Sequence, residues 1–429
     1  MEYKKAYFIG IGGIGMSALA QLLADHGTAV SGSDREASPV TELLESKGIN
    51  VVIGQKPENV PSDADVIIYS EAVWEDNPER ARAKELSLRQ ISYFEALGEV
   101  SYKKKTIAVA GTHGKTTTTG MTAKILADGG ASPTAVVGSI VKDFGSNYLH
   151  GDSDLFVVEA CEYKRDFLTL SPFVLVITNI EWDHTDYYKD LADFQKAFRE
   201  LAEKVPADGA IVTNPNDPII ALVLRSLGEA GPTIIDYTKE PAYDLRLPGE
   251  FNKDNARAAA AAARLVHPDI TDDSIATSLS HFHGTWRRFE HKGTAKSGAE
   301  VYDDYAHHPT SVAKTLAELR KKLTPGSKLF VAFHPHLYSR TRDLLPEFAA
   351  AFKDADEVII APIYPAREPD DGVTSNKLLA EKIAETGTHA RFGTFEEIEH
   401  ILSTEPGPSD LIVTMGAGDI YKVADRLVK

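Results

Sequence analysis

Cysteine is nearly absent from this chain: Cys161 is the only one in 429 residues. One thiol excludes a disulfide within the chain, and such low cysteine usage is typical of proteins in a reducing compartment. No apolar run approaches the roughly 18 residues of a transmembrane helix. The first residues, Met1–Lys5, lead into a glycine turn rather than into the apolar core of a signal peptide. We therefore expect a cytoplasmic protein that does not enter the membrane.

Basic residues are also few relative to acidic ones. The chain has 46 lysines and arginines against 63 aspartates and glutamates, which gives a net charge of −17 at pH 7. A nucleic-acid-binding face needs a basic surplus, so no nucleic-acid partner is expected. Small anionic substrates remain compatible with this composition, because single loops can still be basic. The length predicts two or three domains.

Apolar runs of strand length alternate with helix-compatible segments along the whole chain. The expected strands form three groups: 6–9, 29–31, 51–53 and 66–69; then 107–110, 155–159, 174–179, 210–213 and 233–236; and finally 301–302, 328–333, 357–361 and 410–414. This alternation predicts parallel, doubly wound sheets, and therefore an α/β fold built of three blocks.

The second block opens with the most informative segment of the chain, Thr106–Thr119 (TIAVAGTHGKTTTT). An apolar strand enters a glycine turn that ends in Gly114-Lys115-Thr116, and a helix-compatible segment follows. Such a turn wraps backbone N–H groups around phosphate oxygens, while the lysine places its charge beside the β- and γ-phosphates and the threonine hydroxyl binds Mg²⁺. The loop is a short variant of GxxxxGK[ST], because Val109 stands where the first glycine is usual. The alternative is a glycine-rich surface turn.

The first block carries Gly10-x-Gly12-x-x-Gly15 after a strand, with Asp34 about 20 residues further on. This spacing is typical of loops that hold a diphosphate and a ribose hydroxyl. It fits a nucleotide-diphosphate ligand, a nicotinamide cofactor or a purely structural turn, and we favour the first.

Two further candidates follow strand ends in the second block. Glu159 closes the run LFVVE, and His184 lies in TNIEWDH just past another apolar strand. Ligands of open parallel sheets bind beyond the carboxyl ends of the strands, so Lys115, Glu159 and His184 could converge there. A carboxylate and an imidazole beside a triphosphate suit metal coordination. A hydrogen-bonded structural histidine is the alternative for His184.

Polar clusters continue through the end of the second block and into the third. Asn252 and Asn255 share one face at the start of an alanine-rich helix, where the first could instead be a helix cap. The segment DDYAHHP follows one strand, and HPHLYSRTR, with Arg340 and Arg342, follows the next. Paired arginines suit the capture of a carboxylate or phosphate, or are surface charge. Zinc is not favoured, because no cysteine or further ligand stands at metal-binding spacing.

Taken in this order, the motifs resemble those of the Mur ligase family. The resemblance covers essentially the whole chain and rests on FIGIGGIGMSALA, AGTHGKTTTT, VVEACEY, TNIEWDH, PGEFNKDNARAA, FHGTWRRFE, DDYAHHPTSV, FHPHLYSRTRDL, IYPAREP and MGAGDI. It implies three domains: a Rossmann-like UDP-sugar-binding domain over 1–100, a central P-loop ATPase-type parallel sheet over 101–287, and a C-terminal Rossmann-like domain over 288–429. The glycine turn of the first block is then a cradle for UDP.

The resemblance also implies roles for single residues. The catalytic group would comprise Lys115, Glu159, His184, Arg288 and Asp304, with Thr116, Glu159 and His184 as the metal ligands. ATP would be held by Gly111, Thr112, His113, Gly114, Lys115, Thr116, Thr117, Asn252 and Asn255. The UDP moiety would be held by Gly12, Gly13, Ile14, Gly15, Asp34 and Ser70. The incoming amino acid would be surrounded by Tyr305, His307, His336, Arg340 and Arg342.

The implied activity is the ATP- and Mg²⁺-dependent joining of L-alanine to UDP-N-acetylmuramate through an acyl phosphate, by a monomer or a homodimer. The nearest alternative is a ligase that recycles a murein tripeptide. An NAD-dependent oxidoreductase would explain the first block only, and a non-catalytic nucleotide-binding regulator would bind ATP without turnover. The sequence departs from the family pattern at Phe251, where histidine is usual, and at Leu337, where a basic residue is common. The stretch 237–249 is short, and the carbamylated lysine of some relatives has no clear counterpart, although Lys196 and Arg199 lie nearby.

Overall fold

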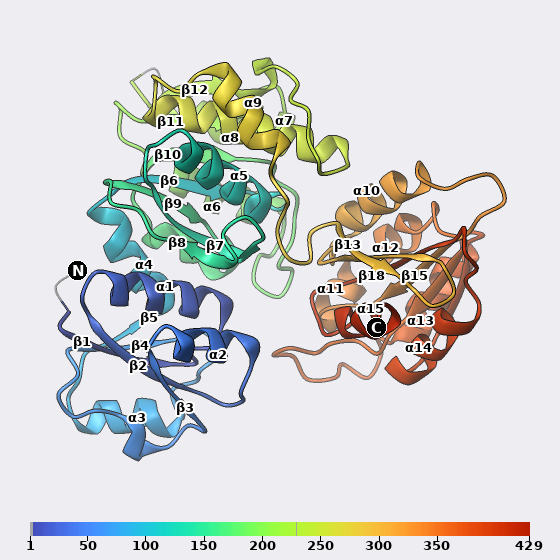
Figure 1. The fold of residues 1–429 in the computed structure, drawn as a ribbon, viewed down its shortest axis with the longest axis horizontal. Coiled ribbons are helices and arrows are strands. Elements are labelled where there is room, and N and C mark those ends of the chain that lie inside the picture. Colours follow the sequence, from blue (N-terminus) through green and yellow to red (C-terminus); the bar gives the residue numbers. More distant parts are fainter. Residues whose placement is uncertain (1–2, 229) are drawn as a thin grey trace. The chain divides into compact units, whose positions relative to one another are not determined.

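The computed structural model describes residues 3–228 and 230–429. Its contacts divide the chain into two compact units (Figure 1). The first unit comprises Met1–Ile180, Gln195–Asp244 and Asp254–His283; the second comprises Glu181–Phe194, Leu245–Lys253 and Gly284–Lys429. The short segment Glu181–Phe194, which follows a strand of the first unit in sequence, therefore folds with the C-terminal unit.

The first unit begins with a five-stranded parallel sheet of order β3-β2-β1-β4-β5. Its strands are β1 (Lys5–Ile9), β2 (Ala29–Asp34), β3 (Asn50–Ile53), β4 (Val66–Tyr69) and β5 (Gln90–Ser92), and its helices are α1 (Ile14–Asp25), α2 (Pro39–Ser46), η1 (Pro57–Asn59), α3 (Pro78–Glu85) and α4 (Tyr93–Tyr102). The chain leaves β1 toward β2 and later returns to β4 on the other side of β1. The carboxyl ends of β1 and β4 therefore flank the crevice in which doubly wound sheets bind ligands.

A seven-stranded sheet of order β12-β11-β10-β6-β9-β7-β8 completes the first unit. Its strands are β6 (Lys105–Ala110), β7 (Thr134–Val141), β8 (Ser146–Leu149), β9 (Leu155–Glu159), β10 (Pro172–Ile177), β11 (Ala210–Thr213) and β12 (Thr233–Asp236). The helical segments are α5 (Lys115–Asp128), η2 (Tyr163–Thr169), α6 (Leu191–Ala202), α7 (Pro218–Leu224), η3 (Arg225–Leu227), η4 (Tyr237–Lys239), α8 (Glu250–Val266) and α9 (Asp272–Ser280). Central β6 is buried between β9 and β10, and it opens directly into the phosphate-loop sequence.

An antiparallel hairpin, β7–β8, forms one edge of this otherwise parallel sheet. Its Asn147 side chain donates a hydrogen bond to the Ile14 carbonyl at the start of α1 and another, at 3.1 Å, to the Ser17 hydroxyl. The hairpin thereby fixes the beginning of the helix that follows the glycine turn.

The second unit contains a six-stranded sheet of order β13-β14-β18-β15-β16-β17, in which only the β13–β14 pair is antiparallel. Its strands are β13 (Glu290–Thr294), β14 (Glu300–Asp304), β15 (Leu329–Phe333), β16 (Glu357–Ile360), β17 (His389–Phe392) and β18 (Leu411–Met415). Its helices are α10 (Pro309–Arg320), α11 (Tyr338–Asp343), α12 (Leu345–Ala351), α13 (Asn376–Glu385), α14 (Phe395–Thr404) and α15 (Tyr421–Leu427).

Both faces of this last sheet are buried. Along β15, Leu329, Val331 and Phe333 join one apolar cluster, whereas Phe330 and Ala332 join the other. Successive side chains point to opposite faces, so a strand covered on both faces reads as an unbroken apolar run. Three sheets that alternate with helices along the chain confirm the α/β fold built of three blocks, while the boundaries at 100 and 287 stay predictions. Among the described residues, no helix has both the length and the apolar character that crossing a membrane requires.

Candidate active site

The glycine turn of the first unit lies between β1 and α1. Its Gly12 N–H donates a 2.8 Å hydrogen bond to the Asp34 carboxylate at the end of β2. Gly10 has a φ of +83°, and a Cβ there would stand 3.2 Å from that of Ser70 after β4. A Cβ at Gly15 would stand 2.6 Å from the Tyr93 ring, so a larger residue here would require that ring to move. The structure thus brings Gly12 to Asp34 and Gly10 to Ser70, while Gly13 precedes Ile14 as the N-cap of α1.

The phosphate loop joins β6 to α5. Gly111 and Gly114 have φ values of +133° and +86°, which lie in the region that favours glycine. Gly114 is the N-cap of α5, and the side chain of Asn255 lies against it where a Cβ would be. Thr116 and Thr117 are buried in the first turn of the helix. The first backbone N–H groups of α5, which have no partner within the helix, therefore adjoin the loop, as anion binding requires.

The end of β10 fixes the loop from the side. Thr112 N–H donates to the Asn179 carbonyl at 3.1 Å, and His113 N–H donates to the Asn179 side-chain oxygen at 2.9 Å. The Thr178 hydroxyl donates to the His113 carbonyl at 2.6 Å. Sequence reasoning did not select Thr178 or Asn179, although both lie in the TNIEWDH segment that it examined.

Lys115 is held inside this loop. Its ammonium donates to the Gly111 carbonyl at 2.6 Å and to the Glu162 carboxylate at 2.8 Å. The two side chains are 15% and 2% exposed, respectively. Burial alone lowers the pKa of Lys115, but the negative charges of Glu162 and Glu159 outweigh it and raise the pKa above its usual value. The lysine is therefore fully charged at neutral pH.

The Thr116 hydroxyl donates to the Glu159 carboxylate at 3.1 Å, and the other oxygen of Glu159 accepts the Gly138 N–H at 2.9 Å. A hydroxyl and a carboxylate beside a phosphate loop are the hard oxygen ligands that Mg²⁺ prefers. These residues therefore fit the expected ion. Whether His184, which belongs to the second unit, completes the set stays a prediction.

The segments that follow β14 and β15 carry three candidates of the second unit: Tyr305, His307 and His336. The Tyr305 and His307 rings lie 5.3 Å apart, and those of His307 and His336 lie 6.1 Å apart. Burial, and then the charge of Arg340, lower the pKa of His307 well below its usual range and the pKa of His336 to about 3. Both rings are therefore neutral at physiological pH.

Hydrogen bonds fix the tautomers of these two rings. His307 Nδ1 faces the Tyr305 carbonyl at 2.9 Å, and a carbonyl can only accept, so this nitrogen carries the proton. His336 Nδ1 faces Arg340 Nη1 at 3.0 Å, and a guanidinium can only donate, so here the proton is on Nε2. The pair therefore offers one acceptor, His307 Nε2, and one donor, His336 Nε2–H.

The two predicted arginines of α11 have different environments. Arg340 is buried and pairs with Asp183 at 2.8 Å. Arg342 is 51% exposed and pairs with Asp343 and Asp371. The structure therefore does not bring Arg342 into the cluster of His307, His336 and Arg340.

The arginines at the start of β13 also differ. Arg287 is buried, pairs with Asp303 at 2.8 Å, and donates to the Gly416 and Gly418 carbonyls at 2.7 and 2.8 Å. The predicted Arg288 lies with its guanidinium carbon 4.8 Å from the Tyr305 ring centroid. Burial raises the pKa of the predicted Asp304, whose carboxylate accepts a 2.6 Å hydrogen bond from Thr315. Arg287 was missed by sequence reasoning, although it adjoins Arg288 in the same motif.

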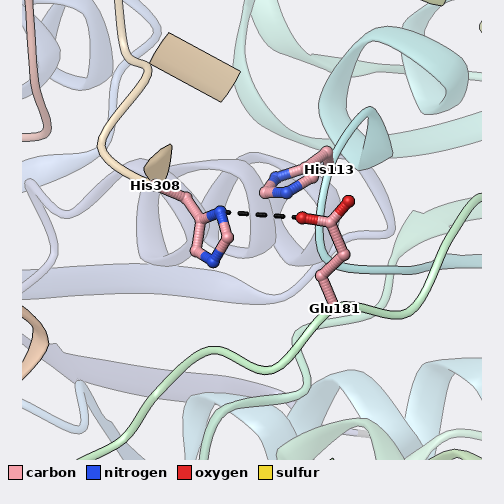
Figure 2. A group of neighbouring side chains, drawn as sticks. All are labelled: His113, Glu181 and His308. Carbon is pink, nitrogen blue, oxygen red and sulfur yellow. Dashed lines mark ion pairs between the residues drawn. The ribbon is translucent and has the colours of Figure 1, made fainter. Parts of the chain in front are cut away.

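The segment Glu181–His184 is attached to this C-terminal domain. Figure 2 shows the His308 ring facing the Glu181 carboxylate, with Nδ1 3.7 Å from an oxygen. The other ring nitrogen of His308 lies 3.3 Å from the Trp182 carbonyl. Elsewhere, the predicted Asn252 donates to the Pro248 carbonyl at 2.6 Å within the first turn of α8, so it is not the N-cap of that helix.

Three family models match consecutive parts of the chain. They are "Mur ligase family, catalytic domain" over residues 5–105, "Mur ligase middle domain" over 109–245, and "Mur ligase, glutamate ligase domain" over 287–418. The chain therefore belongs to the Mur ligase family.

Single members of the family match this chain over nearly its whole length. The UDP-N-acetylmuramate–L-alanine ligase of Clostridium botulinum is 39% identical, and the match covers 99% of this chain and 97% of that protein. The crystal structure of the UDP-N-acetylmuramate-alanine ligase of Thermotoga maritima is 28% identical with a TM-score of 0.81, covering 99% and 98% of the two chains. A murein peptide ligase from Psychrobacter arcticus has a TM-score of 0.73 at 24% identity over 99% and 98%, a likeness of fold.

Proposed function

We propose that this protein joins L-alanine to the lactyl carboxylate of UDP-N-acetylmuramate and converts ATP to ADP and phosphate. One observation carries the proposal: the charged Lys115 stands within a complete phosphate loop, in a chain similar over its whole length to alanine-adding ligases. A carboxylate is a poor electrophile, so amide formation needs prior activation, and the loop supplies the site for it.

In the first step, the lactyl carboxylate attacks the γ-phosphorus of ATP. The bond from that phosphorus to the β–γ bridging oxygen breaks, ADP leaves, and an acyl phosphate forms. Lys115 and the N–H groups at the start of α5 stabilise the charge on the transferring phosphoryl group. Thr116 and Glu159 would hold Mg²⁺, with His184 as a further candidate ligand. When bound, the ion would neutralise part of the negative charge of the phosphates.

In the second step, the free amine of alanine attacks the acyl carbon, and phosphate leaves from the tetrahedral intermediate. The neutral His307 Nε2 can accept a hydrogen bond from the amine, and His336 Nε2–H can donate one to the alanine carboxylate. The two rings can therefore contact both ends of an α-amino acid, and the proton lost by the attacking nitrogen passes to the departing phosphate.

Phosphate release from ATP tests the proposal in separate reactions that contain UDP-N-acetylmuramate and L-alanine, glycine, L-serine or a murein tripeptide. Release that requires both the sugar nucleotide and L-alanine is expected. Release with the tripeptide alone would instead identify the recycling reaction. ATP binding without release in any mixture would contradict a ligase function.

We further propose that the reaction takes place in the cytoplasm, where ATP and nucleotide sugars are made, and that the enzyme is a monomer or a homodimer. Cell fractionation tests the first statement, and light scattering of the purified protein tests the second. A membrane-associated fraction, or a larger assembly, would contradict them.

A further inference from the structure

One carboxylate oxygen of Asp183 has two donors. It accepts the His184 N–H at 2.6 Å and the Arg340 Nε–H at 2.8 Å. Asp183 and Arg340 are 4% and 2% exposed, so this is a buried ion pair. Removal of only one partner would leave the other charge buried and unpaired.

The same oxygen stabilises an unusual backbone conformation. His184 has a φ of +51°, in the left-handed region that non-glycine residues seldom adopt. Such conformations persist only when surrounding interactions enforce them, and they concentrate at functional sites. The hydrogen bond from the His184 N–H to Asp183 is one such interaction.

Arg340 extends the connection in the other direction. Its Nη1 donates to His336 Nδ1 at 3.0 Å, which fixes the proton of that ring on Nε2. Two of the three guanidinium nitrogens, Nε and Nη1, are thus bonded to protein groups. Arg340 is thereby oriented between Asp183 and His336, so its charge and its donors act on both neighbours.

We propose that Asp183 and Arg340 are positioning residues, and that this single buried pair sets both the backbone conformation at His184 and the hydrogen-bonding form of His336. The inference rests on the proposed function, because that function gives His184 its metal-binding role and His336 its amino-acid-binding role. The same ion pair would then act on the residue proposed to bind the metal and on the residue proposed to bind the amino acid. Neither residue touches the reacting atoms.

A double variant, Asp183→Leu with Arg340→Met, tests the proposal. It removes both charges together, so that neither is left buried and unpaired, and apolar replacement of a buried ion pair is often tolerated. We expect a folded protein whose kcat/KM for L-alanine falls by about 10²-fold, since small misplacements of reacting groups have effects of this size. Glu381→Gln is the matched control: it removes an exposed ion pair with Lys377 in the same unit and should retain turnover.

Nitrogen NMR of the protein labelled on histidine gives a readout that needs no metal, substrate or turnover. In the wild type, the His336 signals, assigned with His336→Gln, should show the Nε2–H tautomer. In the double variant this preference should be lost, because Nδ1 no longer has a donor. If the double variant does not fold, the wild-type spectrum alone still decides, because a proton on Nδ1 of His336 would overturn the proposal.

Unaltered His336 signals in the folded variant, or normal alanine kinetics, would overturn the proposal. Failure of the proposed function has a different signature. The wild-type protein would then release no phosphate with L-alanine, while its histidine spectra would still decide whether Arg340 fixes the tautomer.

Discussion

The ammonium of Lys115 lies 2.8 Å from the buried carboxylate of Glu162. The cation of the phosphate loop is thus held by the protein itself, and ATP phosphates would meet a lysine that is already oriented and charged. Glu162 follows β9 by three positions, and its role could not be inferred from the loop motif. The central sheet therefore supports the lysine from the strand next to the one that carries the loop.

Lys115→Ala should reduce phosphate release by about 10³-fold or more, because the charge that stabilises the phosphoryl group in the transition state is lost. Steady-state turnover with saturating substrates measures this. Lys103→Ala, at an exposed position just before β6, is the control and should leave turnover unchanged. Near-normal turnover of the Lys115 variant would show that the loop does not serve catalysis.

Asp34→Ala should weaken the binding of UDP-N-acetylmuramate by about 10-fold or more, because a hydrogen bond to a charged acceptor is lost from the Gly12 N–H. The interaction contributes equally to ground and transition states, so KM should rise while kcat stays the same. Asp63→Ala, which removes an exposed pair with Lys5 in the same domain, should change neither constant. A fall in kcat at unchanged KM would contradict a binding role for Asp34.

Substitution by alanine should affect different properties at two adjacent arginines: stability at Arg287 and turnover at Arg288. Arg287→Ala leaves Asp303 buried without its cation and frees two glycine carbonyls, so the free energy of unfolding should fall by about 3–5 kcal/mol. Arg288→Ala should slow turnover without a comparable loss of stability. Urea unfolding and steady-state kinetics on both variants separate these effects. An equal loss of stability in both would contradict the assignment.

His334 provides a prediction for pH dependence. Burial lowers its pKa from 6.5 to about 4, so the folded protein stays neutral at this ring while the unfolded chain takes up a proton. Its contribution to stability is present above the unfolded value and is lost as the pH falls toward the folded value. His334→Phe removes this titration and keeps the ring contacts with Tyr364 and Phe395.

Urea unfolding at two pH values measures the effect. Between about pH 7 and about pH 5, the variant should lose about 2 kcal/mol less stability than the wild type. Among the described residues, the buried Nδ1 of His334 has no hydrogen-bond partner, so phenylalanine removes none from that atom. The same pH dependence in both proteins would contradict the neutral, buried form of His334.

The strands that carry the candidate site were predictable from the sequence because they are buried on both faces. Each expected apolar run corresponds to an observed strand, with ends displaced by a few residues. The strands that were not foreseen lie mainly at sheet edges: β5, β8, β13 and β17 are short, and polar residues interrupt them. β7 is apolar but is interrupted by Gly138, and the need for a glycine there comes from the neighbouring strand β9. A Cβ there would overlap the carboxylate of Glu159.

Within the site, the sequence identified the residues of the phosphate loop and of the glycine turn, because their chemistry depends on local spacing. It did not identify Glu162, Asp183 or Arg287. Each acts through a partner that is distant in the chain: Lys115, Arg340 and Asp303, respectively. Adjacent sequence motifs reveal which residues can bind a ligand, whereas the partners that orient them become visible only when the strands are assembled.

The most direct test of the account uses UDP-N-acetylmuramate whose lactyl carboxylate is labelled with heavy oxygen, together with ATP and L-alanine. Mass spectrometry of the products then follows both the amide and the oxygen. The account predicts a sugar nucleotide that carries one alanine residue, and one labelled oxygen in the inorganic phosphate released. Phosphate without label, or label in AMP, would contradict activation through an acyl phosphate, and an unmodified sugar nucleotide would contradict alanine ligation itself.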